Sequence, residues 1–428
     1  MQVLKRGIAA LLIVSATAVS PLAASAESLS DALVSAYRNS GLLDQQRALL
    51  RVRDEDVAIA VAATRPALNY AFSSTWSSTD SDGAPSAVNS TRASAQLSAS
   101  LTLFDFGRNQ LSIDLARENV LMAREALVGV EQSVLLRAVQ AFLNVRSAHE
   151  AAMLRANNVR LFTQELRAAR DRFEVGEITQ TDVSLSEAAL AAAKSNEAAA
   201  RGQLMIAREE YKAAIGHYPN GLRVPPAVPM TARSLNDAKA VARSHHPDVL
   251  SAQKSVKVAE LATEITKRGM LPTLSANASV ARNLLEDPIP DNTTGTLSVT
   301  LSGPIYQGGR ISALYRQSRA QAEAARAALH ISVQGVEQSV ANAWAQLAVA
   351  AASIRATDQQ IRASRVALRG AREEQALGAR TTLEVLTFEQ DLLDAQSARI
   401  SAESDQYLAV YGLLSAMGLL TAEHLKLG

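Results

Sequence analysis

The feature that most constrains the fold is a long stretch without proline that occurs twice in the sequence. Residues 107–216 and 309–418 contain no proline, so each is free to form helix along its length. The pairs Gly107/Gly309, Gly176/Gly378 and Gly216/Gly418 share an offset of 202 residues, whereas Pro66 and Pro272 lie 206 residues apart. The chain is therefore a tandem duplication whose first copy has a slightly longer loop between Pro66 and Gly107.

Each proline-free stretch predicts a long helical hairpin. In the first, apolar residues recur at helical spacing from Arg108 to Phe173, a run of roughly 65 residues and about 100 Å. Val175-Gly176 and Leu377-Gly378 supply the turns, and Thr179 or Thr181 caps the first returning helix. Because small residues dominate, the two antiparallel helices of a hairpin are expected to pack closely as a coiled coil.

In four shorter segments the apolar residues recur at every second position, so these segments are predicted to be strands. They cover residues 67–78, 92–103, 273–282 and 295–303, where apolar residues alternate with Ser, Thr, Asn and Gln. Each is about ten residues long, enough for a tilted strand to cross a bilayer, and its uncharged polar face suits a water-filled lumen. An amphipathic hairpin packed on a soluble core is the alternative interpretation.

Four strands do not close a membrane barrel, because the smallest such barrels have about eight. An open sheet in lipid leaves backbone groups unpaired along its edges, which is costly without water. If these strands cross a membrane, several copies of the chain must combine.

The N-terminus has the pattern of a secretory signal peptide over residues 1–26. Lys5 and Arg6 precede an apolar core, and Ala24-Ser25-Ala26 forms a small-residue cleavage site. The chain has no cysteine, which excludes disulfides and a lipid-modified N-terminal cysteine. Its formal net charge of +1 gives no reason to expect nucleic acid as a partner.

The predicted organisation after the signal peptide has two structural repeats and a short tail. The first repeat covers residues 27–216, with its hairpin tip near 173–180. A proline-rich linker at 217–233 separates it from the second repeat at 234–420, whose tip lies near 375–381. Residues 421–428 form a C-terminal tail.

Taken together, these motifs resemble TolC-like outer membrane factors, the outer membrane efflux protein family. Leu103-Phe-Asp-Phe-Gly-Arg108 and Ile305-Tyr-Gln-Gly-Gly-Arg310 stand where that family bends from strand into helix, and the turns at Gly176 and Gly378 resemble its hairpin tips. The resemblance covers residues 28–420. It implies a mainly α fold with membrane β-strands, in which three chains share a twelve-stranded outer-membrane barrel and their coiled-coil hairpins form a periplasmic α-barrel.

The same resemblance implies a function without chemistry. The protein is expected to be the passive exit duct of a tripartite export system in the bacterial outer membrane, for drugs and other small molecules or for type I secreted proteins. Its expected partners are two further copies of itself, a periplasmic adaptor, an inner-membrane RND pump or ABC transporter, and outer-membrane lipid. No cofactor or metal site is expected. A secreted or periplasmic structural coiled coil, or an adhesin without channel activity, is the alternative.

Four residues match family positions at the closed end of the duct. Asp182 in the first tip and Arg380 in the second correspond to residues whose charge-assisted bonds hold the channel shut. Glu384 corresponds to an acidic residue that narrows the entrance by threefold repetition, and Asp391 offers a further carboxylate along the same helix. The local alternatives are a helix-capping Asp182, a solvated Arg380 and an exposed helical Glu384.

Two further groups of residues are placed by position in the family pattern. The tips resemble its adaptor-docking surface, which comprises Val175, Gly176, Glu177, Leu377, Gly378 and Ala379. Aromatic residues on and beside the strands are expected at the membrane–water interface, and they are Tyr70, Trp76, Phe104, Phe106 and Tyr306. The second tip has Gln375 where the family often has an aromatic residue, which removes one expected gating contact.

Overall fold

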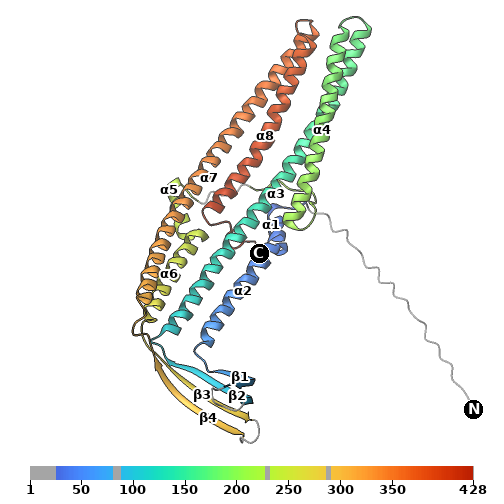
Figure 1. Cartoon of the computed structure of the whole chain (residues 1–428). Helices are drawn as coiled ribbons and strands as arrows, with labels where there is room; N and C mark the ends of the chain where they lie inside the picture. The colour runs from blue at the N-terminus through green and yellow to red at the C-terminus, as the bar shows by residue number, and fades with distance from the viewer. Residues whose placement is uncertain (1–25, 81–87, 227–231, 286–290, 428) are drawn as a thin grey trace, which may run out of the picture.

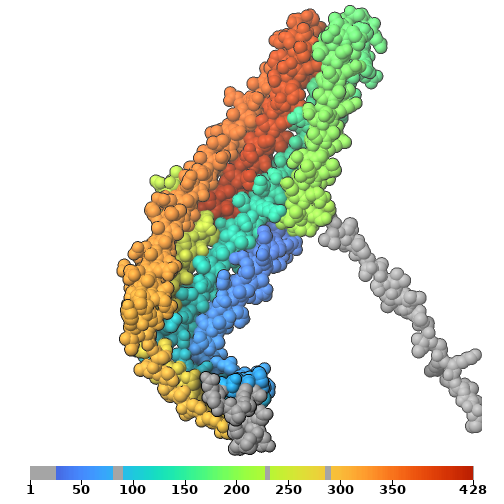
Figure 2. Space-filling model, viewed as in Figure 1, coloured from blue at the N-terminus to red at the C-terminus, as the bar shows by residue number. Residues whose placement is uncertain are grey.

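The computed structural model describes residues 26–80, 88–226, 232–285 and 291–427. It is an elongated molecule with two long helical hairpins at one end and a single four-stranded sheet at the other (Figure 1). The space-filling view shows a slender, curved body that bends where the helices meet the sheet (Figure 2). All but the last residue of the predicted signal peptide, Ala26, lies outside the described residues.

The first repeat begins with two short helices and ends with a long hairpin. Helices α1 (Leu29–Asn39) and α2 (Gly41–Ala62) are separated by Ser40, and Ser28 caps α1 through a capping box with Asp31. After the strands come α3 (Arg108–Glu174) and α4 (Gln180–Ile215), and Thr179, one of the two predicted caps, starts α4. Local start and stop signals thus set these boundaries.

The second repeat reproduces the first nearly residue for residue. Helices α5 (Leu235–His245) and α6 (Pro247–Arg268) have the 11 and 22 residues of α1 and α2. Helix α7 (Arg310–Ala376) has the 67 residues of α3, and α8 (Thr382–Ala416) has 35 against the 36 of α4. Both long helices start at a glycine with positive φ, Gly107 and Gly309, a conformation that side chains with a Cβ rarely adopt.

The sheet joins the two repeats through its middle strands. It is antiparallel with the order β1 (Ala67–Thr79), β2 (Val88–Phe104), β3 (Thr273–Leu285) and β4 (Asn292–Ser302). Strands β1 and β4 are therefore its open edges. The β1–β2 and β3–β4 pairs have the same register once the offsets of 206 and 202 are applied, because Ala67↔Ser100 becomes Thr273↔Ser302. The four-residue difference between the repeats thus lies in the β1–β2 and β3–β4 pairs, at the end of the strands that is far from the helices.

The strands are longer than the predicted segments. Strand β2 starts at Val88, four residues before the predicted strand, and β3 continues to Leu285, three residues after it. The extra residues of β2 pair with the end of β1, as Thr79↔Val88 shows. Hydrogen bonds to a partner strand extend the ladder into a polar segment that alternation alone marks as a loop.

The core is a set of narrow contacts between helices rather than one globular interior. The largest cluster joins α1, α3, α4 and α8, and Phe142 and Tyr211 are its largest fully buried side chains. Farther along the hairpins, Arg146 of α3 binds Glu403 of α8 at 2.7 Å, so the repeats are also joined by charge. Among the described residues only α3 contains a window apolar enough, by length and composition, to cross a membrane, and 44% of that window is buried.

The predicted fold class is confirmed. The described residues form long antiparallel helical hairpins and four antiparallel strands, arranged as two copies of one unit. The open strand edges and the two exposed tips lie at opposite ends of the molecule (Figure 1).

Candidate functional site

The two hairpin tips are built by the same turn. In the first, Gly176 N–H donates to Phe173 O at 3.0 Å and Glu177 N–H to Arg172 O at 2.9 Å. This is the Schellman arrangement, which needs the left-handed φ of 79° that Gly176 adopts. In the second tip, Gly378 N–H donates to Gln375 O and Ala379 N–H to Glu374 O, both at 2.9 Å. The adjoining apolar residues, Val175 and Leu377, are left 71% and 85% exposed.

Both returning helices start with a capping box that uses a predicted gate residue. Thr179 Oγ1 donates to Asp182 Oδ2 at 2.6 Å, and the N–H groups of Thr179 and Asp182 each bond the other's side chain. Thr381 and Glu384 repeat the arrangement, with both Thr381 donors 2.9 Å from Glu384 Oε2. These bonds lower the pKa of both carboxyls below the usual range, chiefly through Thr179 for Asp182 and through Thr381 N–H for Glu384.

A threonine that the sequence did not single out, Thr382, is buried at the start of α8 in the second tip. Its Oγ1 accepts from Gln375 Nε2 at 3.4 Å. The Thr382 side chain also helps to lower the pKa of the Asp182 carboxyl in the first tip, after the larger effects of Thr179. Gln375, the residue expected from the resemblance to replace an aromatic side chain, thus bonds within its own hairpin. No local motif marks Thr382, because its role depends on the neighbouring hairpin.

Arg380 is held within its own tip. Its guanidinium binds Glu374, lies 3.5 Å from Glu384 Oε1, and stacks 5.3 Å from the centre of the Phe388 ring. The bond to Glu374 raises its pKa above the ordinary arginine value. Among the described residues no ion pair joins Arg380 to Asp182, so these two residues are not brought together within one chain. Asp391 is exposed on α8, beyond Glu384.

Below the tips, a charge cluster connects the hairpins. Arg372 of α7 binds Glu389 of α8 and lies 3.6 Å from Glu165 of α3. Burial raises the pKa of the Glu389 carboxyl, and Glu165 raises it further, whereas Arg372 lowers it. Glu389 Oε2 has no partner among the described atoms. The first repeat contains the equivalent pair, Arg170 and Glu187.

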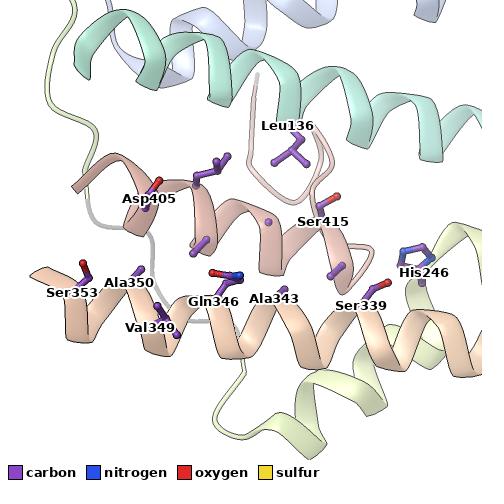
Figure 3. A pocket seen from close by; sticks show the side chains of 14 residues that line it. Leu136, His246, Ser339, Ala343, Gln346, Val349, Ala350, Ser353, Asp405 and Ser415 are labelled. Carbon is purple, nitrogen blue, oxygen red and sulfur yellow. The ribbon is translucent and has the colours of Figure 1, made fainter. Parts of the chain in front are cut away.

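A groove of about 670 Å³ runs between α7 and α8, far from the tips (Figure 3). Gln346 and Asp405 line it from the two helices, and Leu136 of α3 faces it. His246 stands at its end, near Ser415 in the last turn of α8. His246 Nδ1 caps α6 by accepting from Asp248 N–H at 3.2 Å, and burial lowers its pKa although Asp248 opposes the shift.

The predicted interfacial aromatics are at the sheet end of the chain. All five are exposed: Tyr70 and Trp76 on β1, Phe104 at the end of β2, Phe106 just before α3, and Tyr306 just before α7. The rings of Phe104 and Phe106 pack 4.7 Å apart. Among the described residues no group of three or more His, Asp or Glu side chains is arranged to hold a metal ion.

Comparison with known proteins identifies the family. The model of the outer membrane efflux protein family matches residues 32–217 and 240–419. The outer membrane efflux protein BepC of Brucella suis is 35% identical over 99% of this chain and 92% of its own length. The proteases secretion protein PrtF of Dickeya chrysanthemi is 27% identical over 87% of this chain and 84% of its own.

Solved structures show the same fold at lower identity. CusC superposes with a TM-score of 0.80 at 18% identity, covering 91% of this chain and 92% of CusC. The outer membrane protein VceC of Vibrio cholerae superposes with a TM-score of 0.76 at 19% identity, covering 91% and 96%. Proteins of this family form trimers and work with periplasmic adaptors and inner-membrane pumps or secretion systems.

These relatives are channel proteins, and they exclude the alternative of a structural coiled coil or adhesin. The helical hairpins belong to the periplasm and the strands to the outer membrane. The chain is thus a member of the outer membrane efflux protein family, an outer-membrane exit duct of the kind that serves efflux and type I secretion.

Proposed function

We propose that three copies of this chain form one passive duct that is closed at its hairpin tips and opened by a periplasmic adaptor. The strand edges support the assembly, because β1 and β4 both end the sheet and lipid offers no partner for their backbone groups. Three chains supply twelve strands, which is enough to close a barrel. The duct performs no catalysis, an inference that rests on its relatives being channels.

The observation that carries the gate is that the second hairpin packs against the first close to the tips, where Leu386 of α8 contacts the cluster that contains Val183 and Leu190 of α4. Thr382 of the second tip contributes to the lowered pKa of the Asp182 carboxyl in the first, and Gln375 donates to the same threonine, so in the closed duct these side chains form a hydrogen bond between the tips. Such a bond is made only while the hairpins lie side by side, so it stabilises the closed arrangement. An adaptor that binds the tips more strongly than this bond holds them can separate them and open the duct. Arg380, Glu384 and Asp391 complete the constriction, with Arg380 and Glu384 presented from the second tip.

The tips also provide a docking surface for the adaptor. Val175 and Leu377 are exposed at equivalent positions, each beside a glycine turn with free space around it. Glu177 and Ala379 follow those glycines and differ in charge, so the two tips offer related but distinct contacts. An inner-membrane RND pump or ABC transporter supplies the energy and selects drugs, other small molecules or secreted proteins. Tyr70, Trp76, Phe104, Phe106 and Tyr306 hold the barrel at the lipid–water interface.

Conductance in planar bilayers tests the gate. Asp182→Ala and Thr382→Val each remove one end of the bond between tips, and both are expected to raise the conductance several-fold. Arg380→Ala is expected to act in the same direction, because it frees Glu374 and Glu384. Thr179→Ala is the matched control, since it removes the α4 cap but leaves the Asp182 carboxylate free to meet Thr382. If Thr179→Ala opens the channel as much as Asp182→Ala, Asp182 acts only as a cap and the proposed gate is wrong.

A further inference from the structure

One face of the sheet is apolar, and the strand register shows which residues share it. Cross-strand partners lie on the same face of a sheet, and so do residues two positions apart along one strand. Leu97 of β2 pairs with Val280 of β3, which pairs in turn with Gly295 of β4. In the proposed barrel this face meets the lipid, because the opposite face consists mainly of Ser, Thr, Asn and Gln.

A hollow of about 400 Å³ lies on this apolar face. It is open where the side chains are small, at Ala99, Ala278 and Gly295. The residues around it come from all four strands, so the hollow belongs to a single chain. Its large apolar side chains are each at least 55% exposed, and they are Leu68, Leu97, Val280 and Leu297.

Gly295 is a glycine that the backbone does not require. Its φ lies outside the left-handed region, and β3 and β4 pair across it without a bulge. No described atom lies within 4 Å of where a Cβ on Gly295 would be, so crowding does not require it either. A glycine inside a strand weakens the strand, and one that no bulge explains is typical of a place where a ligand approaches the backbone closely.

A cation stands at one end of the hollow. Arg282 follows Val280 by two residues along β3 and pairs with Ala95, the partner of the exposed Phe72, so it lies on the same apolar face. It is about 7 Å farther from the helices than Val280. Its side chain is 64% exposed, and its Nη2 lies 3.5 Å from Asp291 Oδ2. Such an exposed pair is weak, and a guanidinium has five N–H donors, so donors remain for a second anion.

The repeat places Arg282 at the depth of an interfacial aromatic residue. Moving Arg282 back by 206 residues gives Trp76, which is expected at the membrane–water interface. Equivalent positions lie at one depth when the two repeats alternate around a barrel. A charge on the lipid face is tolerated near the headgroups and is costly at the bilayer midplane. Because this end of the strands is far from the periplasmic helices, the headgroups in reach are those of the outer leaflet (Figure 1).

We propose that each chain binds one phosphorylated lipid of the outer leaflet, with a phosphate on Arg282 and an acyl chain in the hollow beside Gly295. A guanidinium binds phosphate through two parallel N–H donors, and the hollow offers an acyl chain more apolar contact than a flat sheet does. The outer leaflet of a bacterial outer membrane consists largely of an anionic glycolipid with phosphates and several acyl chains, which fits both features. The inference rests on the proposed barrel and adds a binding site to it.

Native mass spectrometry of the full protein, extracted in detergent and mixed with diphosphoryl lipid A, tests the phosphate contact. The wild type is expected to bind one lipid per chain, and Arg282→Gln is expected to bind it roughly tenfold more weakly, because hydrogen bonds to a charged group are lost. Arg92→Gln is the matched control, since Arg92 pairs with Thr75 on the opposite face of the sheet. It is expected to bind lipid as the wild type does. Equal binding by Arg282→Gln and the wild type would overturn the proposal.

Filling the hollow tests the acyl chain. Gly295→Leu places a side chain where the structure has open space, and it is expected to weaken the binding of diphosphoryl lipid A several-fold. Ala276→Leu is the control, because it adds the same side chain to the same face beside Leu101 and Val299, nearer the helices and outside the hollow. If the two leucine variants bind lipid equally well, no acyl chain occupies the hollow.

The charge of the lipid is tested at Asp291. Asp291→Asn removes a carboxylate that competes with phosphate for Arg282, so it is expected to tighten the binding of diphosphoryl lipid A. Weaker binding would mean that Asp291 holds a positively charged headgroup, which would overturn the anionic lipid. The masses in the same spectra separate this site from the proposed duct. A trimer that binds diphosphoryl and dephosphorylated lipid A equally overturns the lipid site alone, whereas the absence of any trimer overturns both.

Discussion

Glu187 and Glu389 occupy the same position in the two returning helices, yet only Glu389 is buried. Each binds an arginine 17 residues earlier in the chain, Arg170 and Arg372 respectively. The Glu187 side chain is 48% exposed and that of Glu389 is 2% exposed. The difference arises from α3, which packs on α8 and brings Glu165 to Arg372. The ion pair therefore links only its own hairpin in the first repeat, whereas in the second repeat it also connects that hairpin to α3.

Removing the arginine is expected to have unequal effects in the two repeats. Arg372→Ala leaves a buried carboxylate without its cation and is expected to cost about 1–3 kcal/mol. Arg170→Ala breaks an exposed pair and is expected to cost less than about 1 kcal/mol. The thermal unfolding midpoints of both variants in detergent check this. Equal shifts would show that the buried position of Glu389 has no energetic consequence.

The pH dependence of stability is expected to differ between the wild-type protein and the variant Glu389→Gln, which has no carboxyl at this position. Burial raises the pKa of Glu389 above its ordinary value of 4.5. A raised pKa gives a contribution to stability that is fully present below the unfolded-state value and is lost as pH rises through the folded-state value. Relative to Glu389→Gln, the wild type is therefore expected to gain stability as pH falls from 7 toward 4.5. The unfolding midpoints of both proteins across that range measure the difference. If the wild type instead loses stability relative to Glu389→Gln as pH falls, the pKa of Glu389 is not raised in the folded protein.

His246 is expected to make the free energy of unfolding rise with pH, opposite to the effect of Glu389. Burial lowers its pKa below the ordinary 6.5, although Asp248 opposes the shift. Between the folded-state pKa and 6.5 the unfolded chain binds the proton more strongly, so the free energy of unfolding rises with pH. His246→Asn keeps a side chain able to cap α6 and is expected to flatten the slope between pH 5 and 7. His245→Asn is the control, since His245 is exposed, and its slope is expected to match the wild type.

The boundaries of the helices could be predicted from sequence because local residues determine them. Thr179, Gly176 and Gly378 act through bonds to residues within five positions in the chain. The extension of β2 to Val88 could not be predicted, since it depends on the ladder to β1. Thr382 and Glu389 were missed for the same reason, because their roles depend on a neighbouring hairpin. Asp182 was predicted as either a gate residue or a cap. Its carboxylate caps α4, and its gate role stays a prediction.

Gly418 and Gly216 end α8 and α4 at repeated positions, and their replacement by alanine is expected to have unequal costs. Both have positive φ, which costs a residue with a Cβ about 1–2 kcal/mol. A Cβ on Gly216 would lie 2.8 Å from the Asn39 side chain, which can move aside. A Cβ on Gly418 would lie 2.6 Å from His246 Cα, and backbone cannot yield as easily.

Gly418→Ala is therefore expected to cost roughly 1–3 kcal/mol more than Gly216→Ala. The difference between the two unfolding midpoints measures this, with the wild type as reference. A larger loss in Gly216→Ala would mean that Asn39, which bonds Ile215 O at 3.3 Å, is the more rigid neighbour.

The mass of the protein extracted from outer membranes in detergent tests the central claim most directly. Light scattering, with the micelle subtracted, is expected to give three chain masses, because twelve strands from three chains are needed to cover the open edges of β1 and β4. A monomer or dimer that stays in solution without detergent would contradict the shared barrel, and with it the duct.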